Sequence, residues 1–270
     1  MKKLFLAFPM QSSFSISTNI ESFINQLRLR YGDYIAETQA LADFSIVVTK
    51  ETDSYKISTN ENSTFTKYPL QEIDYLISRH TVYHESVLAL HGAAVEWNQS
   101  AYLFLAATTS GKTTLTSYLT HRGCGYLTDD CILLDRSTFY IYPYTTPLQI
   151  RDGGLDILKK NHAEPFPLKA LEEASTLLRW IYTPPNCIKK TIPVKKIFFI
   201  ERNETHNQVI EMSKQERMIA LMKAPITDYK ITGDYLRTLS RLASIDCYLL
   251  RYCDMNFVKE LIQNDSGINT

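Results

Sequence analysis

The stretch Ala106–Thr114, AATTSGKTT, lies between an apolar run and a helical pattern, and it decides the fold class. Its second half, Gly111-Lys112-Thr113, satisfies the end of the phosphate-binding pattern G-x-x-x-x-G-K-[ST], whereas Ala106 stands where the pattern has its first glycine. Such a loop works only between a strand and a helix, because its amides and the amino end of the helix face the phosphates together. AYLFLA before the loop predicts that strand, and KTTLTSYLT predicts that helix.

Ala106 leaves two interpretations of the loop open. Either it is a nucleotide site with one altered residue, or it is a surface turn that contains Gly-Lys-Thr by chance. If the position required a positive φ angle, alanine would cost about 1 kcal/mol there. The flanking strand and helix favour the nucleotide site, in which Lys112 lies between the β- and γ-phosphates and the Thr113 hydroxyl binds Mg²⁺.

Two acidic residues follow the loop. GYLT predicts a strand that ends at Thr128, and Asp129 and Asp130 come directly after it. Successive side chains of an extended backbone point in different directions, so one carboxylate can hold Mg²⁺ while the other faces an acceptor hydroxyl. His91, in the predicted strand LHGAAVEW, is a third candidate, although a lone histidine is more often a satisfied core residue.

The composition limits the class of protein. The chain has 270 residues, of which 44% are hydrophobic, so it can form one large domain or two small ones. Its 29 basic residues equal its 29 acidic residues, which indicates no general attraction to nucleic acid or to an anionic membrane. No apolar stretch approaches the ~20 residues that span a bilayer. The spacing of the five cysteines fits neither a zinc site nor a disulfide framework, so we expect a cytoplasmic protein with free thiols.

Two regions are predicted along the chain. Residues 1–84 form an α+β lobe without a chemical motif, a candidate for peptide recognition, with strands in KLFLAF, FSIVVT and DSYKIST and helices in NIESFINQLRLRY and PLQEIDYLISRHTVYHESVL. Residues 85–270 form the nucleotide-binding catalytic domain. Its helices are expected at residues 113–122, 213–223, 233–243 and 256–262, the first ending at Gly123. Its later strands are expected in TFYIY, LQIR, VKKIFFIE and CYLLRY.

The order of these motifs resembles one family. LHGAAV, a strand, Gly-Lys-Thr-Thr, a helix that ends in Arg-Gly, and YLTDD together look like the HPr serine kinase/phosphorylase family, and LQIRDGGLDIL is similar to its arginine–glycine segment. The C-terminal region resembles the short HPr-kinase-related peptide kinases, including the lasso-peptide kinases. The resemblance covers Leu88–Arg151 most clearly. It implies an α/β fold with a phosphoenolpyruvate-carboxykinase-like P-loop kinase core and a smaller α+β N-terminal lobe.

The resemblance also implies a role for each motif residue. Asp129 would be the base for the acceptor serine, and His91 would lie near that acceptor. Thr113 would bind Mg²⁺, and Asp130 would lie at the metal or support the base. Arg151 would reach the phosphoryl group in flight, where a fixed cation offsets developing charge. The residues that would bind ATP, with Lys112 also taking part in catalysis, are Thr108, Thr109, Ser110, Gly111, Lys112, Thr113 and Thr114.

One position departs from the family's pattern. An acidic residue often precedes the signature arginine, but Gln149 is found near that place here, so the metal ligand would be missing or supplied by Asp152. The implied function is ATP- and Mg²⁺-dependent phosphorylation of serine on a peptide or small protein, as in ribosomal-peptide modification. A small-molecule kinase and a non-catalytic nucleotide-binding regulator of the same fold are the alternatives.

Recognition of the acceptor must be local, because the net charge is zero. Strand edges of the N-terminal lobe can bind an extended peptide by β-addition. The loop from Thr183 to Lys196 is a second candidate, and we expect the peptide to lie between the lobe and this loop. The loop carries Lys189, Lys190, Lys195 and Lys196.

Overall fold

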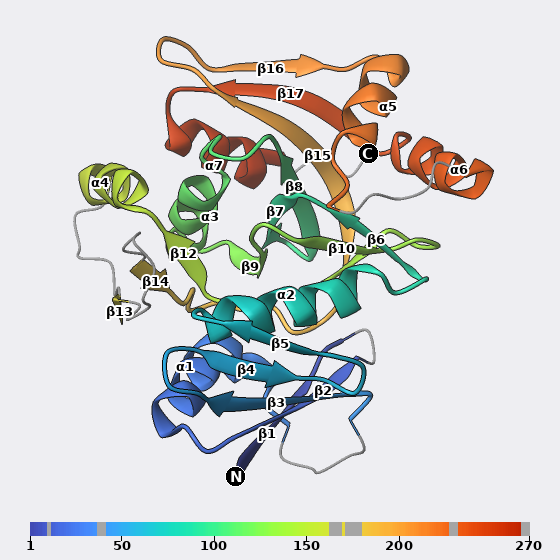
Figure 1. Cartoon of the computed structure of the whole chain (residues 1–270). Helices are drawn as coiled ribbons and strands as arrows, with labels where there is room; N and C mark the ends of the chain where they lie inside the picture. The colour runs from blue at the N-terminus through green and yellow to red at the C-terminus, as the bar shows by residue number, and fades with distance from the viewer. Residues whose placement is uncertain (10–11, 37–41, 162–168, 171–179, 227–231, 266–270) are drawn as a thin grey trace. The chain divides into compact units, whose positions relative to one another are not determined.

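The computed structural model describes residues 1–9, 12–36, 42–161, 169–170, 180–226 and 232–265. The chain is a mixed α/β protein with several sheets, which confirms the predicted class (Figure 1). The described residues form two compact units, one made of those in Met1–His84 together with Ala170, and the other made of those in residues 85–169 and 180–265. No helix among the described residues has the length and apolar character needed to cross a membrane.

The first unit is a five-stranded sheet in the order β1-β2-β3-β4-β5 with helices on one face. Leu4, Ile16 and Ile46 are paired across β1, β2 and β3 and are all buried, so one face of the sheet forms the core beneath α1 and α2. The elements are β1 (Lys2–Ala7), β2 (Ser13–Thr18), α1 (Glu21–Tyr31), the 3₁₀ turn η1 (Gly32–Tyr34), β3 (Phe44–Lys50), β4 (Tyr55–Ser58), β5 (Ser63–Thr66) and α2 (Pro69–Val82).

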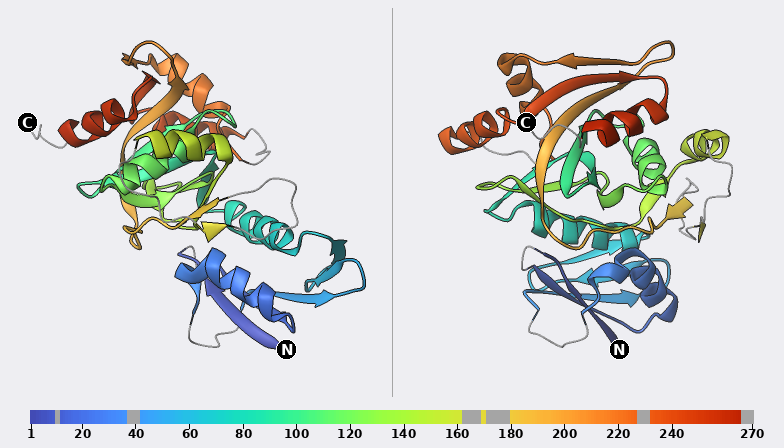
Figure 2. Two further views of the ribbon diagram at one scale, coloured as in Figure 1. Left: turned by 90° about the vertical axis from the view of Figure 1, so that its left-hand side faces the viewer. Right: turned by 180° about the vertical axis from the view of Figure 1, so that it is seen from behind.

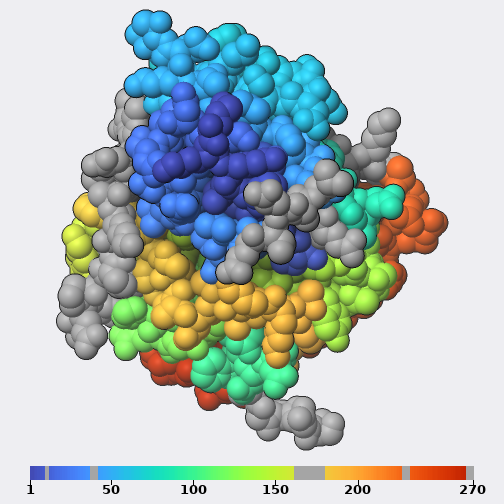
Figure 3. Space-filling model, turned by 90° about the horizontal axis from the view of Figure 1, so that it is seen from below, coloured from blue at the N-terminus to red at the C-terminus, as the bar shows by residue number. Residues whose placement is uncertain are grey.

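The sequence predicted five of these eight elements and missed β2, β5 and the short turn η1. KLFLAF, FSIVVT and DSYKIST overlap β1, β3 and β4, and Pro69 stands in the first turn of α2 as expected. β2 is rich in serine, and β5 buries none of its residues, so neither carries a strong apolar signal. Lys2, Lys3 and Ala7 of β1 are exposed. The N-terminal part of the chain, blue in Figure 3, lies at the surface seen in that view.

The second unit is built on a nine-stranded sheet. Seven strands follow one another in the order β6-β10-β11-β15-β8-β7-β9. In addition, β17 pairs with β15 and with β16. A small separate sheet has the order β12-β14-β13. The strands are β6 (Val87–Leu90), β7 (Gly92–Trp97), β8 (Ser100–Leu105), β9 (Gly125–Thr128), β10 (Ile132–Asp135), β11 (Tyr140–Tyr142), β12 (Leu148–Ile150), β13 (Lys169–Ala170), β14 (Trp180–Tyr182), β15 (Ile192–Arg202), β16 (Gln208–Glu211) and β17 (Asp246–Tyr252). The helices are α3 (Lys112–His121), α4 (Asp152–Asn161), α5 (Lys214–Met222), α6 (Gly233–Leu242) and α7 (Met255–Asn264).

Strand directions bring the candidate residues to one edge of this sheet. The long strand β15, golden in Figure 2, is parallel to both β8 and β17, so the carboxyl ends of all three meet. β7 is antiparallel to β8 and to β9, with Gly92 opposite Leu105 and Ala94 opposite Thr128. The start of β7 and the end of β9 therefore lie at the edge where β8 ends. Ligands of open α/β sheets bind at this kind of edge.

The predicted elements around the loop are present. The structure differs from the prediction at the start of β7 and in the additional helix α4. α3 ends before Gly123, whose φ of 103° allows the Gly123 and Cys124 amides to donate to Thr120 and Leu119 carbonyls. The expected strand LHGAAVEW starts at Gly92, and its first two residues are not part of it, because β6 ends at Leu90 and His91 lies outside both strands. α4 was not predicted, because two adjacent glycines in its first turn weaken the helical pattern.

Candidate nucleotide-binding site

The loop after β8 has its unusual backbone angles at Thr109 and Gly111, with φ of 68° and 90°. Gly111 is the residue that caps the start of α3, where a left-handed angle suits glycine. Ala106 is not among the described residues with positive φ. The alanine therefore occupies an ordinary backbone conformation, and the cost considered from the sequence does not arise at this position.

Ala106→Gly is accordingly expected to change ATP·Mg²⁺ affinity by no more than about threefold, because glycine adds backbone freedom without relieving strain. Calorimetric titration of both proteins with ATP·Mg²⁺ measures the difference. Lys112→Ala, for which we expect a large loss of ATP·Mg²⁺ affinity, is measured for comparison. An increase of about tenfold or more in the glycine variant would contradict this prediction and indicate that the nucleotide-bound loop requires positive φ at this position.

Lys112 begins α3 and is folded back across the loop. Its Nζ donates to the carbonyl oxygens of Ala106 and Ala107, both at 2.9 Å, and only 4% of the residue is exposed. Burial lowers the pKa of this ammonium, and Asp130 and Asp129 act in the opposite direction. The two neutral carbonyls are weaker partners than phosphate oxygens, so a bound phosphate would compete well for the ammonium.

Asp129 follows β9 and binds the residue next to Lys112. Its Oδ2 accepts a hydrogen bond from the Thr113 hydroxyl at 2.7 Å. Its Oδ1 is buried without a hydrogen-bond partner among the described residues. Burial and then the charge of Asp130 raise the pKa of this carboxyl, whereas the Thr113 hydrogen bond and Lys112 lower it. A buried carboxylate oxygen without a donor is a site that favours a cation.

Asp130 and His91 form a second pair at the same edge. Asp130 is exposed and has a φ of 66°, a left-handed angle that aspartate tolerates better than most residues. The His91 Nδ1 lies 3.1 Å from the Asp130 carbonyl oxygen, which can only accept, so Nδ1 donates. The Nε2 atom of His91 is buried and has no hydrogen-bond partner in the described part of the chain. The backbone amide of His91 donates to the Ala224 carbonyl. Gly92 next to it leaves no room for a Cβ against Leu105.

A cavity of about 480 Å³ brings most of the predicted residues together. Its lining combines the loop with residues from the starts or ends of several elements, and Asp129 is not part of that lining. The predicted residues in the lining are His91, Thr108, Thr109, Ser110, Gly111, Lys112, Thr113, Thr114, Asp130 and Arg151. Gln149 also lines the cavity, whereas Asp152, expected as a substitute metal ligand, accepts a hydrogen bond from the Trp180 indole at 3.1 Å.

Arg202 was missed from the sequence, although it lines the same cavity. It is the last residue of β15 and stands opposite Tyr252, the last residue of β17. Its place at the carboxyl end of a strand parallel to β8 could have identified Arg202, because ligands of such sheets bind at the carboxyl ends of the strands. Gly153 and Gly154 of α4 also line the cavity. Gly154 packs so closely that a Cβ there would lie 2.9 Å from the Thr114 hydroxyl oxygen.

The side-chain oxygens at this edge are suited to a Mg²⁺ ion that takes its remaining ligands from phosphate oxygens. Among the described residues there is no group of three or more His, Cys, Asp and Glu side chains that could hold a metal ion. Mg²⁺ needs fewer protein ligands than that, because it binds one or two carboxylates and takes phosphate oxygens and water for the rest. The Thr113 hydroxyl and the unpartnered Oδ1 of Asp129 fit this requirement, with Asp130 beside them.

No family model matches this sequence, and no curated protein matches it. Among solved structures, the chain is similar to the HPr(Ser) kinase/phosphatase from Coxiella burnetii, with 12% sequence identity and a TM-score of 0.33. The alignment covers 66% of this chain and 95% of that one. At this identity and TM-score, the likeness transfers no activity to this chain.

Proposed function

We propose that this chain is an HPr-kinase-like serine kinase with a phosphoenolpyruvate-carboxykinase-like P-loop core, and that it phosphorylates a peptide or small protein. The observation that carries the proposal is the hydrogen bond between Thr113 and Asp129, beside the buried Lys112. In P-loop enzymes, a threonine or serine of the loop and an aspartate after a strand hold Mg²⁺ together.

Each group at this edge has a place in phosphoryl transfer. The amides around Ser110–Thr113 and the Lys112 ammonium bind the β- and γ-phosphates. Mg²⁺, when bound at Thr113 and an aspartate, supplies positive charge to the phosphate oxygens. The serine oxygen forms a bond to the γ-phosphorus, the bond to the bridging oxygen breaks, ADP leaves, and an aspartate takes the hydroxyl proton. Arg151 and Arg202 line the cavity and offset charge on the transferred group.

The two aspartates divide the metal and base roles. The family resemblance implies that Asp129 is the base and that Asp130 lies at the metal or supports the base. The contact between Asp129 and Thr113 favours the reverse, because the threonine is the loop's Mg²⁺ ligand. The exposed Asp130, which lines the cavity next to His91, is then the carboxylate available to an acceptor hydroxyl.

The lysines proposed for acceptor binding fall into two groups. Lys195 and Lys196 belong to β15, and both pair with Asp265, with the Lys195 Nζ 2.8 Å from the Asp265 carbonyl oxygen. These contacts tie β15 to the end of α7 and give both lysines a structural role. Lys189 and Lys190 are exposed and remain candidates for contact with the acceptor.

The proposal predicts transfer of label from γ-labelled ATP to a peptide. Purified protein, Mg²⁺ and peptides encoded beside this gene should give a labelled serine, identified by mass spectrometry. Label on a small molecule instead would favour the small-molecule kinase. Binding of ATP with neither label transfer nor ADP formation would favour the non-catalytic regulator, and absence of ATP binding would contradict all three functions.

A further inference from the structure

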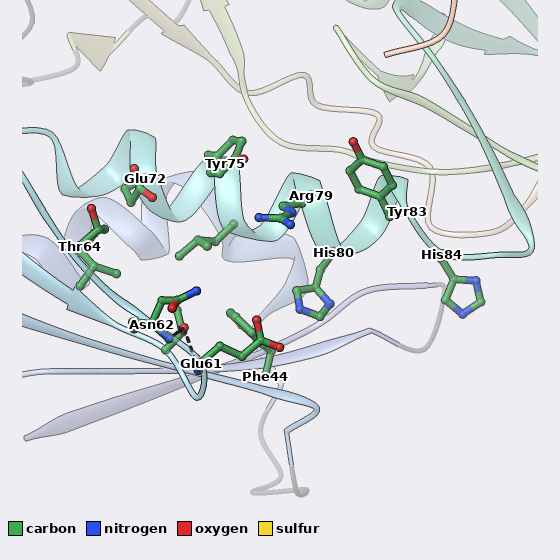
Figure 4. A pocket seen from close by; sticks show the side chains of 13 residues that line it. Phe44, Glu61, Asn62, Thr64, Glu72, Tyr75, Arg79, His80, Tyr83 and His84 are labelled. Carbon is green, nitrogen blue, oxygen red and sulfur yellow. Dashed lines mark hydrogen bonds between the residues drawn. The ribbon is translucent and has the colours of Figure 1, made fainter. Parts of the chain in front are cut away.

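A second cavity, of about 790 Å³, lies wholly within the first unit (Figure 4). It lies between α2 and the end of the sheet formed by β3, β4 and β5. Phe44, Ile57 and Thr64 line it from the sheet, and the α2 side chains that line it include Glu72, Tyr75 and Arg79. We name this cavity the α2 groove.

The α2 groove adjoins an open strand edge. β5 is the last strand in the order of its sheet, and β4 is its partner among the described strands. Ser63, Thr64 and Phe65 are exposed, so the outer backbone groups of β5 are accessible to another strand. Thr64 pairs with the buried Ile57 and therefore faces the same side of the sheet as the groove. Alternate side chains of a strand added to β5 would point to this side.

The α2 wall of the groove carries exposed tyrosines and two charged side chains that have no ion pair among the described residues. Tyr75 is 56% exposed and Tyr83 is 59% exposed. Glu72 and Arg79 line the groove, and the described residues offer neither of them an ion pair. Exposed tyrosines beside charges are typical of surfaces that bind peptides or proteins, because the rings bury large areas at low entropic cost.

The directions of β5 and α2 determine the order in which a bound peptide would meet the charged residues of the groove. Figure 4 shows Thr64 beside Glu72, and the chain turns back from β5 into α2, so a strand antiparallel to β5 runs in the direction of α2. Such a strand passes Glu72 before Arg79. These two residues lie about two helical turns, or ~10 Å, apart along α2. Side chains on one face of a strand recur at ~6.6 Å and ~13 Å, so partners two or four residues apart can reach both charges.

We propose that the α2 groove binds an extended peptide that pairs antiparallel with β5. The peptide places a basic residue toward Glu72, an apolar residue against Tyr75, and an acidic residue toward Arg79 two or four positions after the basic one. That this peptide is the acceptor of the phosphoryl group rests on the proposed function, whereas its binding in the groove does not.

The test uses the full-length protein as the target of a display library of random dodecapeptides. The selected peptides should share a basic residue followed by an acidic one at the spacing above. The double variant Glu72→Arg, Arg79→Glu should bind these peptides about tenfold more weakly and bind peptides with the two charges exchanged more tightly than wild type does. Lys50→Glu, Glu51→Arg is the matched control, because it exchanges an exposed pair of the same charges outside the groove, and it should bind like wild type.

Two results would overturn the proposal. One is a library selection in which no peptide depends on Glu72 and Arg79, and the other is an equal loss in the control variant. Lys112→Ala separates this inference from the proposed function, because it removes a nucleotide contact and leaves the groove unchanged. Selected peptides should bind Lys112→Ala as they bind wild type, even if the phosphotransfer assay shows that the chain is not a kinase.

Discussion

Replacing Asp129 by asparagine is expected to lower phosphoryl transfer by a factor of about 10² to 10⁴ while ATP still binds. Asparagine has the shape of aspartate and can still accept the Thr113 hydrogen bond, so the fold around the loop should persist. The variant removes the negative charge that a metal ligand or a base requires. The loop amides and Lys112 remain to bind the phosphates. The measurements are kcat on an identified acceptor and calorimetric affinity for ATP·Mg²⁺.

Asp130→Asn is the matched control, and a Mg²⁺ titration separates the two roles. If Asp129 holds the metal, as its contact with Thr113 favours, Asp129→Asn should need more Mg²⁺ for half-maximal rate, and Asp130→Asn should lower kcat at unchanged Mg²⁺ dependence. If Asp129 is the base, the two variants should behave in the opposite way. Wild-type turnover by Asp129→Asn would exclude both assignments.

Lys112→Ala is expected to weaken ATP·Mg²⁺ binding by about 10- to 150-fold, because a hydrogen bond to a charged group contributes about 1.5–3 kcal/mol. Among the described residues, this ammonium donates to the Ala106 and Ala107 carbonyls, and its burial lowers its pKa. Its removal should therefore lower ATP affinity far more than it lowers the free energy of unfolding. Calorimetry and thermal unfolding measure the two effects.

Lys112→Met is the matched control for this change, since it keeps most of the volume of the lysine stem and removes only the charge. We expect it to bind ATP as weakly as Lys112→Ala and to unfold at a temperature closer to that of wild type. Equal ATP affinity in wild type and both variants would show that the loop between β8 and α3 is not a phosphate site.

Local features of the sequence determined the elements that hold the candidate site. Hydrophobic runs and glycine positions placed the strand before the loop, the helix after it and the end of that helix at Gly123. Ser213 and Glu216, three residues apart, form the capping box that starts α5 close to the predicted residue. Such features could be predicted because each depends on a few neighbouring residues and on backbone geometry that they set themselves.

Only the tertiary structure decided which of these features meet. The ordinary φ of Ala106, the hydrogen bond between Thr113 and Asp129, and the place of Arg202 in the cavity depend on how β7, β8, β9 and β15 are ordered and directed. The exposed strand β5 beside the α2 groove has no buried residue to mark it in the sequence. A strand's apolar pattern shows which of its faces is buried, but its neighbours and direction follow from contacts between distant residues, which the pattern of one segment does not contain.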